Sequence, residues 1–239
     1  MPSSSGRALK WEVLSLLKER DLPDLLKQLT KYPPQRVINP LIGALCHREE
    51  AVRLRAAIAL GEVVSRLAQK DLEAARVVMR RLMWMLNEES GGIGWGVPLA
   101  MGEILARSPS LAAEYAHILI SYLREDGNLL EFEPLQREVL WGLARLAREN
   151  PKLMRQKGAL RYIRPFLDSP DLQVRAAAVS ALGLLADSDS VSKIKQLIGD
   201  QTGVPVPEGD QWRIRPLGSL VQEALLRLGS DSAAAKDAI

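Results

Sequence analysis

The stretch that decides the fold is "DLQVRAAAVSALGLLA", Asp171–Ala186. It begins with an acidic residue, continues through a Val-Arg pair and small residues, and reaches a Leu-Gly pair before its end. A second stretch, "EEAVRLRAAIALGEVV" (Glu49–Val64), carries the same residue types in the same order. In both stretches apolar residues recur at intervals of three and four, which predicts helices rather than strands.

The pattern returns along the chain at a nearly constant interval. Alignment of the five matching segments on one late position places these residues in register: Gly61, Gly102, Ala144, Gly183 and Leu226. The steps between them are 41, 42, 39 and 43 residues, and another helical segment precedes each one. A repeat of this length predicts a helical solenoid. We therefore expect an all-α fold, a right-handed α-solenoid of about five to six helix pairs, with helix A of each pair outside and helix B inside.

The two best-matched segments resemble the HEAT-repeat family, in particular the short bacterial HEAT-like repeats of the phycobilisome-lyase type. The matching residues are Asp171, Val174, Arg175, Ala177, Ala181, Leu182 and Gly183, with Val52, Arg53, Ala56, Ala59, Leu60 and Gly61. The resemblance covers roughly residues 35–230 and implies the solenoid fold. It also implies a ladder of acidic and arginine side chains between neighbouring repeats, here from Asp171 with Arg175 and from Glu49 with Arg53.

The domain organisation expected from this pattern is a single repeat domain over residues 1–239. Residues 1–34 form N-terminal capping helices, 35–230 the repeats and 231–239 a flexible tail. The single cysteine, Cys46, cannot form an internal disulfide, and no apolar run reaches the length of a membrane span. The N-terminus lacks an apolar signal region. These features predict a cytoplasmic protein that does not enter a membrane.

A polar stripe along the B helices is the expected binding surface. A groove for a polyanion should repeat Lys and Arg, but Glu62 and Glu103 interrupt the stripe, and the net charge is only +3. A groove for a protein segment accepts both signs and favours Trp and Arg anchors. We therefore expect a non-enzymatic scaffold for another protein or peptide. The candidate groove residues are Arg55, Glu62, Arg66, Trp95, Glu103, Arg107, Trp141 and Arg145.

Two alternatives remain open at this stage. One is a nucleic-acid-binding protein similar to the alkylpurine DNA glycosylases, which are also HEAT-like solenoids. The other, implied only by the lyase-type repeats, is a lyase or chaperone for a tetrapyrrole protein. The chain has no nucleophile elbow, phosphate loop or metalloprotease motif, and no zinc-ligand spacing. No cofactor or metal is therefore expected, while enzymatic activity stays an open question.

Two loops are further candidates for a ligand site. The stretch "SGGIGWGVP" (90–98) contributes Gly92, Gly94 and Gly96, but no Lys-Ser/Thr pair follows it, and the repeat places it at a turn from helix A to helix B. There the regular helix should begin near Gly96 or Val97, with Pro98 in its first turn. The long loop 199–216 contributes Asp210, Trp212 and Arg213.

The remaining signals concern the tryptophans and one acidic loop. Trp11 and Trp84 lie on apolar helix faces and are expected in the core, whereas Trp95, Trp141 and Trp212 suit either the groove or gaps between repeats. The loop 124–134 contains Asp126, Glu131 and Glu133 without the spacing of a calcium loop. These acids are therefore expected to be solvated.

Overall fold

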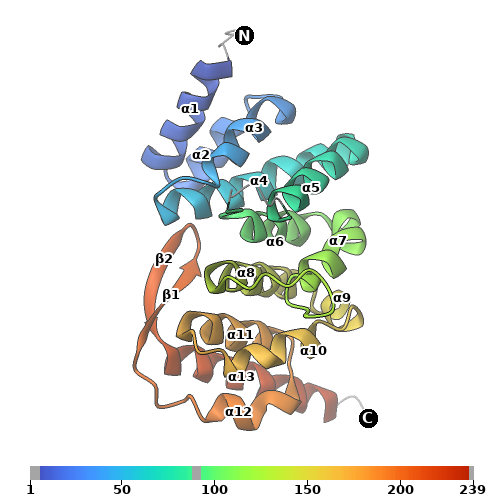
Figure 1. Cartoon of the computed structure of the whole chain (residues 1–239), viewed down its shortest axis with the longest axis vertical. Coiled ribbons are helices and arrows are strands. Elements are labelled where there is room, and N and C mark those ends of the chain that lie inside the picture. Colours follow the sequence, from blue (N-terminus) through green and yellow to red (C-terminus); the bar gives the residue numbers. More distant parts are fainter. Residues whose placement is uncertain (1–5, 88–92, 237–239) are drawn as a thin grey trace. The chain divides into compact units, whose positions relative to one another are not determined.

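The computed structural model describes residues 6–87 and 93–236, which are mostly helical. Successive helices pack in sequential pairs, as Figure 1 shows. The all-α, paired-helix fold class predicted from the repeat is confirmed. Within these ranges no helix has the length and apolar character that a membrane crossing requires.

The chain divides into two compact units. The first comprises Met1–Ala112 with Gly209–Gln211, and the second comprises Ala113–Glu208 with Trp212–Ile239. The helices of the first unit are α1 (Gly6–Glu19), α2 (Leu22–Leu29), α3 (Pro34–Ala44), α4 (Glu50–Lys70), α5 (Leu72–Leu86) and α6 (Val97–Arg107).

The second unit contains most of α7 and all the helices that follow it. Its helical elements are α7 (Pro109–Ser121), α8 (Glu133–Glu149), α9 (Pro151–Gln156), α10 (Ala159–Ile163), the 3-10 segment η1 (Arg164–Asp168), α11 (Leu172–Leu184), the 3-10 segment η2 (Ser188–Ser190), α12 (Val191–Lys195) and α13 (Leu217–Lys236). The predicted B helices are α4, α6, α8, α11 and α13, and the predicted A segments precede them in order.

Short polar side chains start several of these helices. The carboxylate of Asp71 accepts a hydrogen bond of 2.9 Å from the backbone N–H of Ala74 at the start of α5. Asp171 does the same for Gln173 and Val174 at the start of α11. A capping side chain satisfies one of the backbone donors that a helix leaves unpaired at its first turn. The acidic residue of the repeat is therefore a helix cap in the best-matched repeat.

The residues of the predicted ladder make mostly local contacts in the structure. No ion pair joins Asp171 to Arg175 in the described part of the chain, and one carboxylate oxygen of Asp171, Oδ1, accepts both backbone N–H groups at the helix start. In the second stretch Glu49 pairs with Lys18 at 3.1 Å. Arg53 donates to the carbonyl of His47 at 2.9 Å, so it holds the turn before its own helix. The ladder between repeats stays a prediction, since these contacts concern the pairs within each repeat.

The late glycine of the repeat allows close packing between B helices. A Cβ atom on Gly61 of α4 would lie 2.9 Å from the Cβ of Glu103 on α6. In the second unit, a Cβ atom on Gly183 of α11 would lie 2.6 Å from the Cβ of Ala224 on α13. Because such distances are shorter than van der Waals contact, the two backbones can approach this closely only at glycine.

Replacing Gly183 by alanine should therefore destabilise the chain although alanine is the better helix former. We expect the free energy of unfolding to fall by about 1–3 kcal/mol, the usual effect of overpacking a core. The control is Gly43→Ala on α3, where a Cβ atom would meet nothing within 4 Å. Urea denaturation should show a lower midpoint for the first variant and an unchanged or higher midpoint for the second.

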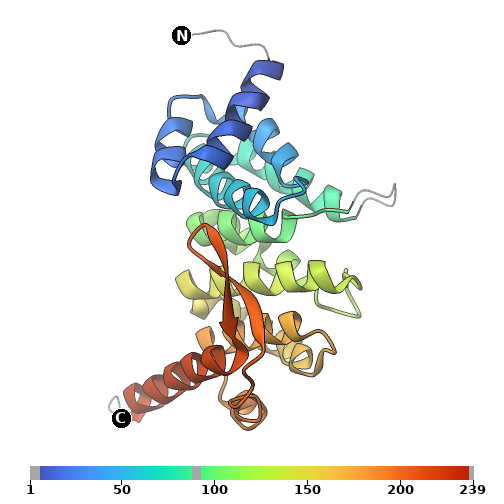
Figure 2. The ribbon, with the colours of Figure 1, turned by 90° about the vertical axis from the view of Figure 1, so that its left-hand side faces the viewer.

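A β-hairpin occupies most of the long loop predicted at 199–216. Strand β1 (Gly203–Glu208) pairs with β2 (Gln211–Pro216), and Figure 2 shows the two strands side by side. Gly209 in the connection has a φ of +60°, which glycine adopts without strain. The hairpin was not predicted, since three prolines at 205, 207 and 216 argue against strands.

The chain end also differs, because α13 continues to Lys236 through residues expected as a tail.

Two tryptophans expected in the core lie on the surface. Trp11 is 67% exposed and Trp84 is 63% exposed. On α1 the buried positions are Leu9, Val13 and Leu17 instead. Apolar residues cover more than one side of these outer helices, so their spacing alone does not identify the side that packs inward.

Candidate functional site

Arg55, a predicted groove residue, is a structural side chain in the first unit. It is 9% exposed. One guanidinium nitrogen donates to the carbonyl of Leu17 at 2.6 Å and another donates to the carbonyl of Arg20. These carbonyls lie at the end of α1, where a helix leaves its last acceptors unpaired. The third nitrogen, Nε, lies 3.2 Å from the carboxylate of Asp210 as an ion pair. Arg55 therefore caps α1, and the groove assignment is wrong for it.

Trp141, the second predicted anchor, belongs to the core of the second unit. It is 6% exposed on α8, and its indole N–H has no hydrogen-bond acceptor among the described residues. Its position in a B helix was read correctly from the sequence, but its side chain turns into the packed side of that helix. The groove assignment is wrong for Trp141 as well.

Four other predicted residues do come together on α4 and α6. Arg107 lies between two carboxylates: one guanidinium nitrogen donates to Glu103, and Nε lies 4.0 Å from Glu62. Arg66 follows Glu62 by one turn on α4 and is half-buried. We call these four residues, Glu62, Arg66, Glu103 and Arg107, the α4–α6 polar surface. It holds two acidic and two basic side chains, all partly open to solvent.

The turn before α6 has a packing role. Gly96 has a φ of +69°, and α6 begins at Val97 as predicted. A Cβ atom on Gly94 would lie 2.8 Å from the side chain of Leu86, which explains why glycine stands there. The ring of Trp95 is half-buried under the guanidinium of Arg53, 5.3 Å from its centroid. Gly92 lies outside the described residues.

The remaining candidates are dispersed. Arg145 pairs with Glu149 at 2.8 Å along α8. Trp212 of β2 is half-buried, with the guanidinium of Arg137 lying 5.5 Å from its ring centroid. Arg213 is exposed and lies 3.9 Å from a carboxylate oxygen of Glu208. None of them joins a cluster of chemically reactive groups, and within residues 6–87 and 93–236 no three His, Cys, Asp or Glu side chains could hold a metal ion together.

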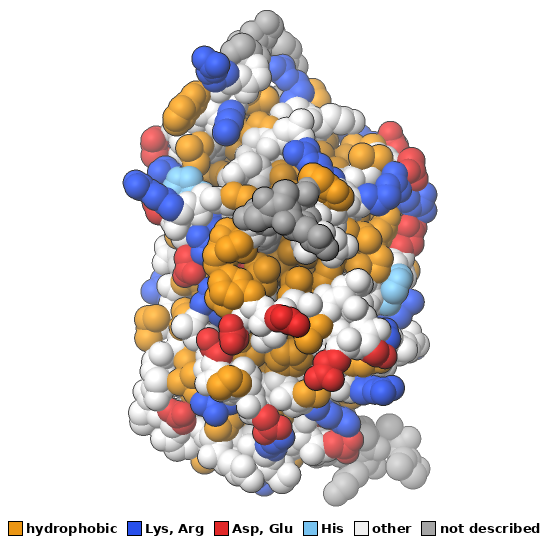
Figure 3. Space-filling view, in the orientation of Figure 1, with side chains coloured by type: hydrophobic (Ala, Val, Ile, Leu, Met, Phe, Trp, Pro, Cys, Tyr) orange, Lys and Arg blue, Asp and Glu red, His pale blue; other side chains and the backbone are white. Residues whose placement is uncertain are grey.

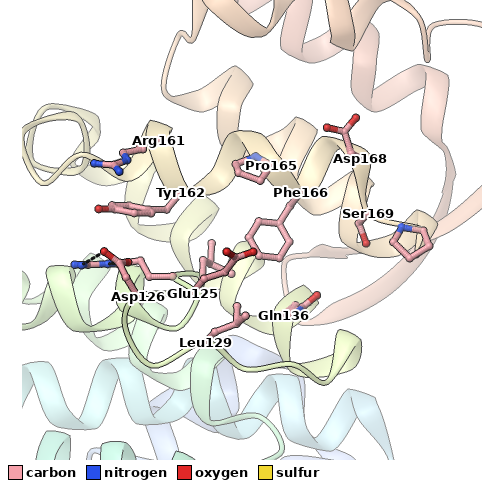
Figure 4. Close-up of a pocket in the computed structure, with 13 residues that line it drawn as sticks. Glu125, Asp126, Leu129, Gln136, Arg161, Tyr162, Pro165, Phe166, Asp168 and Ser169 are labelled. Carbon is pink, nitrogen blue, oxygen red and sulfur yellow. Dashed lines mark hydrogen bonds and ion pairs between the residues drawn. The ribbon is translucent and has the colours of Figure 1, made fainter.

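A pocket that the sequence did not predict lies in the second unit. Its volume is about 650 Å³, and it opens between the loop that follows α7 and the α10–η1 segment, as Figure 4 shows. Its lining residues are Leu123, Arg124, Glu125, Asp126, Leu129, Gln136, Arg161, Tyr162, Pro165, Phe166, Asp168, Ser169 and Pro170. Pockets that bind small molecules or side chains commonly combine such an apolar wall with a few polar groups.

One end of this pocket is a stack of two guanidinium groups and a phenol ring. The guanidinium of Arg124 lies 4.9 Å from the ring centroid of Tyr162, and that of Arg161 lies 5.4 Å from it. Asp126 accepts two hydrogen bonds from Arg124, at 3.0 and 3.1 Å. The bond from Arg124 holds the pKa of Asp126 below its usual value. One of the two positive charges is therefore neutralised inside the stack.

The loop that carries this end is held by hydrogen bonds. The backbone N–H of Leu130 donates to the carbonyl of Tyr122 at 3.1 Å, and Asn128 donates to Ser121 through both its backbone and its side chain. Burial raises the pKa of the Tyr122 phenol to about 12. Sequence reasoning treated this loop as solvated acid and missed the pocket, because Tyr162 and Phe166 come from an element about 35 residues further on.

The outer surface drawn in Figure 3 carries charges of both signs. Lys and Arg side chains and Asp and Glu side chains are both present on this face, with hydrophobic side chains between them.

Comparison with known proteins gives the repeat type. Residues 133–185 match the family model described as a HEAT-like repeat. A protein of uncharacterised function from Archaeoglobus fulgidus is 32% identical over 107 residues, which is 45% of this chain and 52% of that protein. The match thus spans about half the length of this relative.

Solved structures share the fold over nearly the whole chain. An engineered protein covers 96% of this chain and 95% of its own, with a TM-score of 0.56 and 18% identity. A designed armadillo repeat protein, solved in complex with the peptide (KR)4, covers 91% of this chain and 98% of its own, with a TM-score of 0.50 and 18% identity. The chain therefore contains HEAT-like repeat sequence and has the fold of HEAT- and armadillo-type repeat proteins.

Proposed function

We propose that this HEAT-like repeat protein is a non-enzymatic scaffold that binds a polypeptide segment of a partner protein at the α4–α6 polar surface. The observation that carries the proposal is the arrangement of Arg107 between Glu62 and Glu103, with Arg66 one turn away. This surface offers both donors and acceptors on two rigid, closely packed helices. Extended polypeptides need both, since each residue presents one backbone donor and one acceptor.

The charge pattern favours protein over nucleic acid. A nucleic-acid surface gains its affinity from unopposed Lys and Arg that displace counterions. On the α4–α6 polar surface Arg107 lies between two glutamates, so a phosphate backbone would meet carboxylates at the same place. The designed armadillo repeat protein with its bound peptide supports the same choice, since it shows a repeat protein of this fold holding a peptide.

The test uses peptides selected from a random display library against the full chain. For peptides bound at this surface, the double variant Arg66→Ala with Arg107→Ala should weaken binding at least about thirtyfold, because arginine anchors often contribute about 1–2 kcal/mol each at interfaces and about 1.4 kcal/mol corresponds to a factor of ten. The matched control is Arg148→Ala, an exposed arginine on α8. Titration calorimetry measures the dissociation constants, and thermal denaturation shows whether each variant is folded.

Peptides that keep the wild-type dissociation constant with a folded double variant would remove the proposal. Tight binding of duplex DNA at physiological salt, weakened by the same double variant, would instead favour the nucleic-acid alternative. A library that enriches no peptide at all would also count against a peptide-binding scaffold.

A further inference from the structure

We propose that the pocket between the loop after α7 and the α10–η1 segment is a second binding site. Its ligand would be a peptide segment in which an apolar side chain stands between a basic and an acidic residue. The site lies in the second unit on residues 123–170. It does not depend on the α4–α6 polar surface, which belongs to the first unit.

The apolar part of the ligand is specified by the middle of the pocket. Phe166 and Pro165 come from η1, and Leu129 comes from the loop opposite them, as Figure 4 shows. An apolar side chain placed between these groups would remove its own surface and theirs from water, which is favourable in proportion to the area buried. A volume of about 650 Å³ admits such a side chain with its neighbours on either side.

The charged part of the ligand follows from which pocket charges are already paired. Arg124 and Asp126 neutralise each other at 3.0 Å, and Asp168 has Lys193 as an ion-pair partner. In the described part of the chain, neither Glu125 nor Arg161 forms an ion pair, although the charge of Arg161 also helps to lower the pKa of Asp126. A ligand that completes the pocket therefore needs a cation for Glu125 and an anion for Arg161.

The positions of these two groups set an order along the ligand. Arg161 stands with Tyr162 at one end of the pocket, while the carboxylate of Glu125 lies beside the ring of Phe166 in the middle (Figure 4). The apolar side chain against Phe166 therefore has the basic residue next to it and the acidic residue toward Tyr162. A ligand of one sign is disfavoured, because either Glu125 or Arg161 would repel it.

Two further groups suit a peptide backbone. Gln136 donates its amide N–H to the carbonyl of Leu130 at 2.8 Å, which leaves its side-chain oxygen as an acceptor. Ser169 accepts from the backbone N–H of Asp171 through its oxygen, which leaves its hydroxyl proton as a donor. One free acceptor and one free donor in the lining match the N–H and carbonyl of a peptide unit.

The experiment is a charge exchange with peptides selected from the random display library on the full chain. Selected peptides of this site should carry one basic and one acidic residue around an apolar residue. Glu125→Lys should weaken their binding about tenfold, and replacing the basic residue of the peptide by glutamate should restore it. Arg161→Glu should be rescued in the same way by a peptide whose acidic residue is replaced by lysine. The control is Glu131→Lys, an exposed glutamate of the same loop that does not line the pocket.

The outcomes separate this proposal from the α4–α6 polar surface. Peptides weakened by Glu125→Lys and Arg161→Glu, but not by Arg66→Ala with Arg107→Ala, support the pocket. Peptides weakened only by the arginine double variant support the proposed function and overturn the pocket. Selected peptides of uniform charge, failure of the charge exchange to restore binding, or no enriched peptide would each overturn it, provided that circular dichroism shows the variants folded.

Discussion

Replacing Trp141 by alanine is expected to lower the free energy of unfolding by about 3–5 kcal/mol, the usual range for a buried tryptophan. The side chain is 6% exposed on α8, a helix whose packed side also buries Leu140, Leu143 and Ala144. Removing the indole leaves a cavity in this core. It also loses the free energy gained when the indole is transferred from water to the core. Urea denaturation followed by circular dichroism measures the change.

Trp84→Ala is the matched control for this prediction. The residue is the same type but 63% exposed on α5, so its removal should change the free energy of unfolding by no more than about 0.5 kcal/mol. Equal losses for the two variants would show that Trp141 does not lie in the core. Trp141→Phe should retain most of the stability, because it also removes an indole N–H that has no acceptor.

The second large effect is expected at Asp187, which is 2% exposed in the second unit. Arg164 donates to both of its oxygens, at 2.9 and 2.5 Å, and the Ser190 hydroxyl donates at 2.5 Å. Arg164→Ala would leave the carboxylate buried without its cation. We expect a loss of about 3 kcal/mol, the lower end for a broken buried pair, because the Arg164 side chain is itself 37% exposed. The control is Asp189→Asn, which removes the negative charge of a second carboxylate beside Arg164, one whose side chain is 69% exposed.

The same pair predicts a dependence of stability on pH. Burial alone would raise the pKa of Asp187, but the hydrogen bonds from Arg164 and Ser190 outweigh it and lower the pKa below its usual value. A lowered pKa in the folded state contributes stability above the unfolded pKa of about 3.9, and this contribution disappears as the pH falls through the folded value. Asp187→Asn should therefore lose less stability than the wild type between about pH 5 and pH 2. Parallel losses would contradict the assignment.

The sequence was sufficient to predict the helices because each repeat shares both its residue pattern and the way in which its helices pack. Gly61 and Gly183 stand where two B helices approach too closely for a Cβ atom. A Cβ atom at either position would force the two helices apart, which accounts for glycine at these two places, although Ala144 and Leu226 occupy the same register position in other repeats. The start of α6 at Val97 was predicted for a similar local reason, since Gly96 and Pro98 restrict the backbone on either side of it.

Side-chain environments depended on contacts that the sequence does not contain. Arg55 looked like a groove residue because its position in the helix was polar, but the end of α1 supplies carbonyls 35 and 38 residues away. Trp84 and Trp141 have similar apolar neighbours in sequence and opposite exposures. The pocket joins Glu125 to Phe166 across three intervening helices, α8, α9 and α10, so no local pattern could predict it.

The central claim, that a polypeptide binds at the α4–α6 polar surface, is tested most directly by locating a bound peptide. A peptide chosen for its sensitivity to the Arg66→Ala and Arg107→Ala double variant is synthesised with a photoreactive benzophenone group and cross-linked to the full chain. Mass spectrometry then identifies the residues attached. We predict cross-links to α4 near Glu62 and Arg66 and to α6 near Glu103 and Arg107. Cross-links confined to other helices would contradict the account.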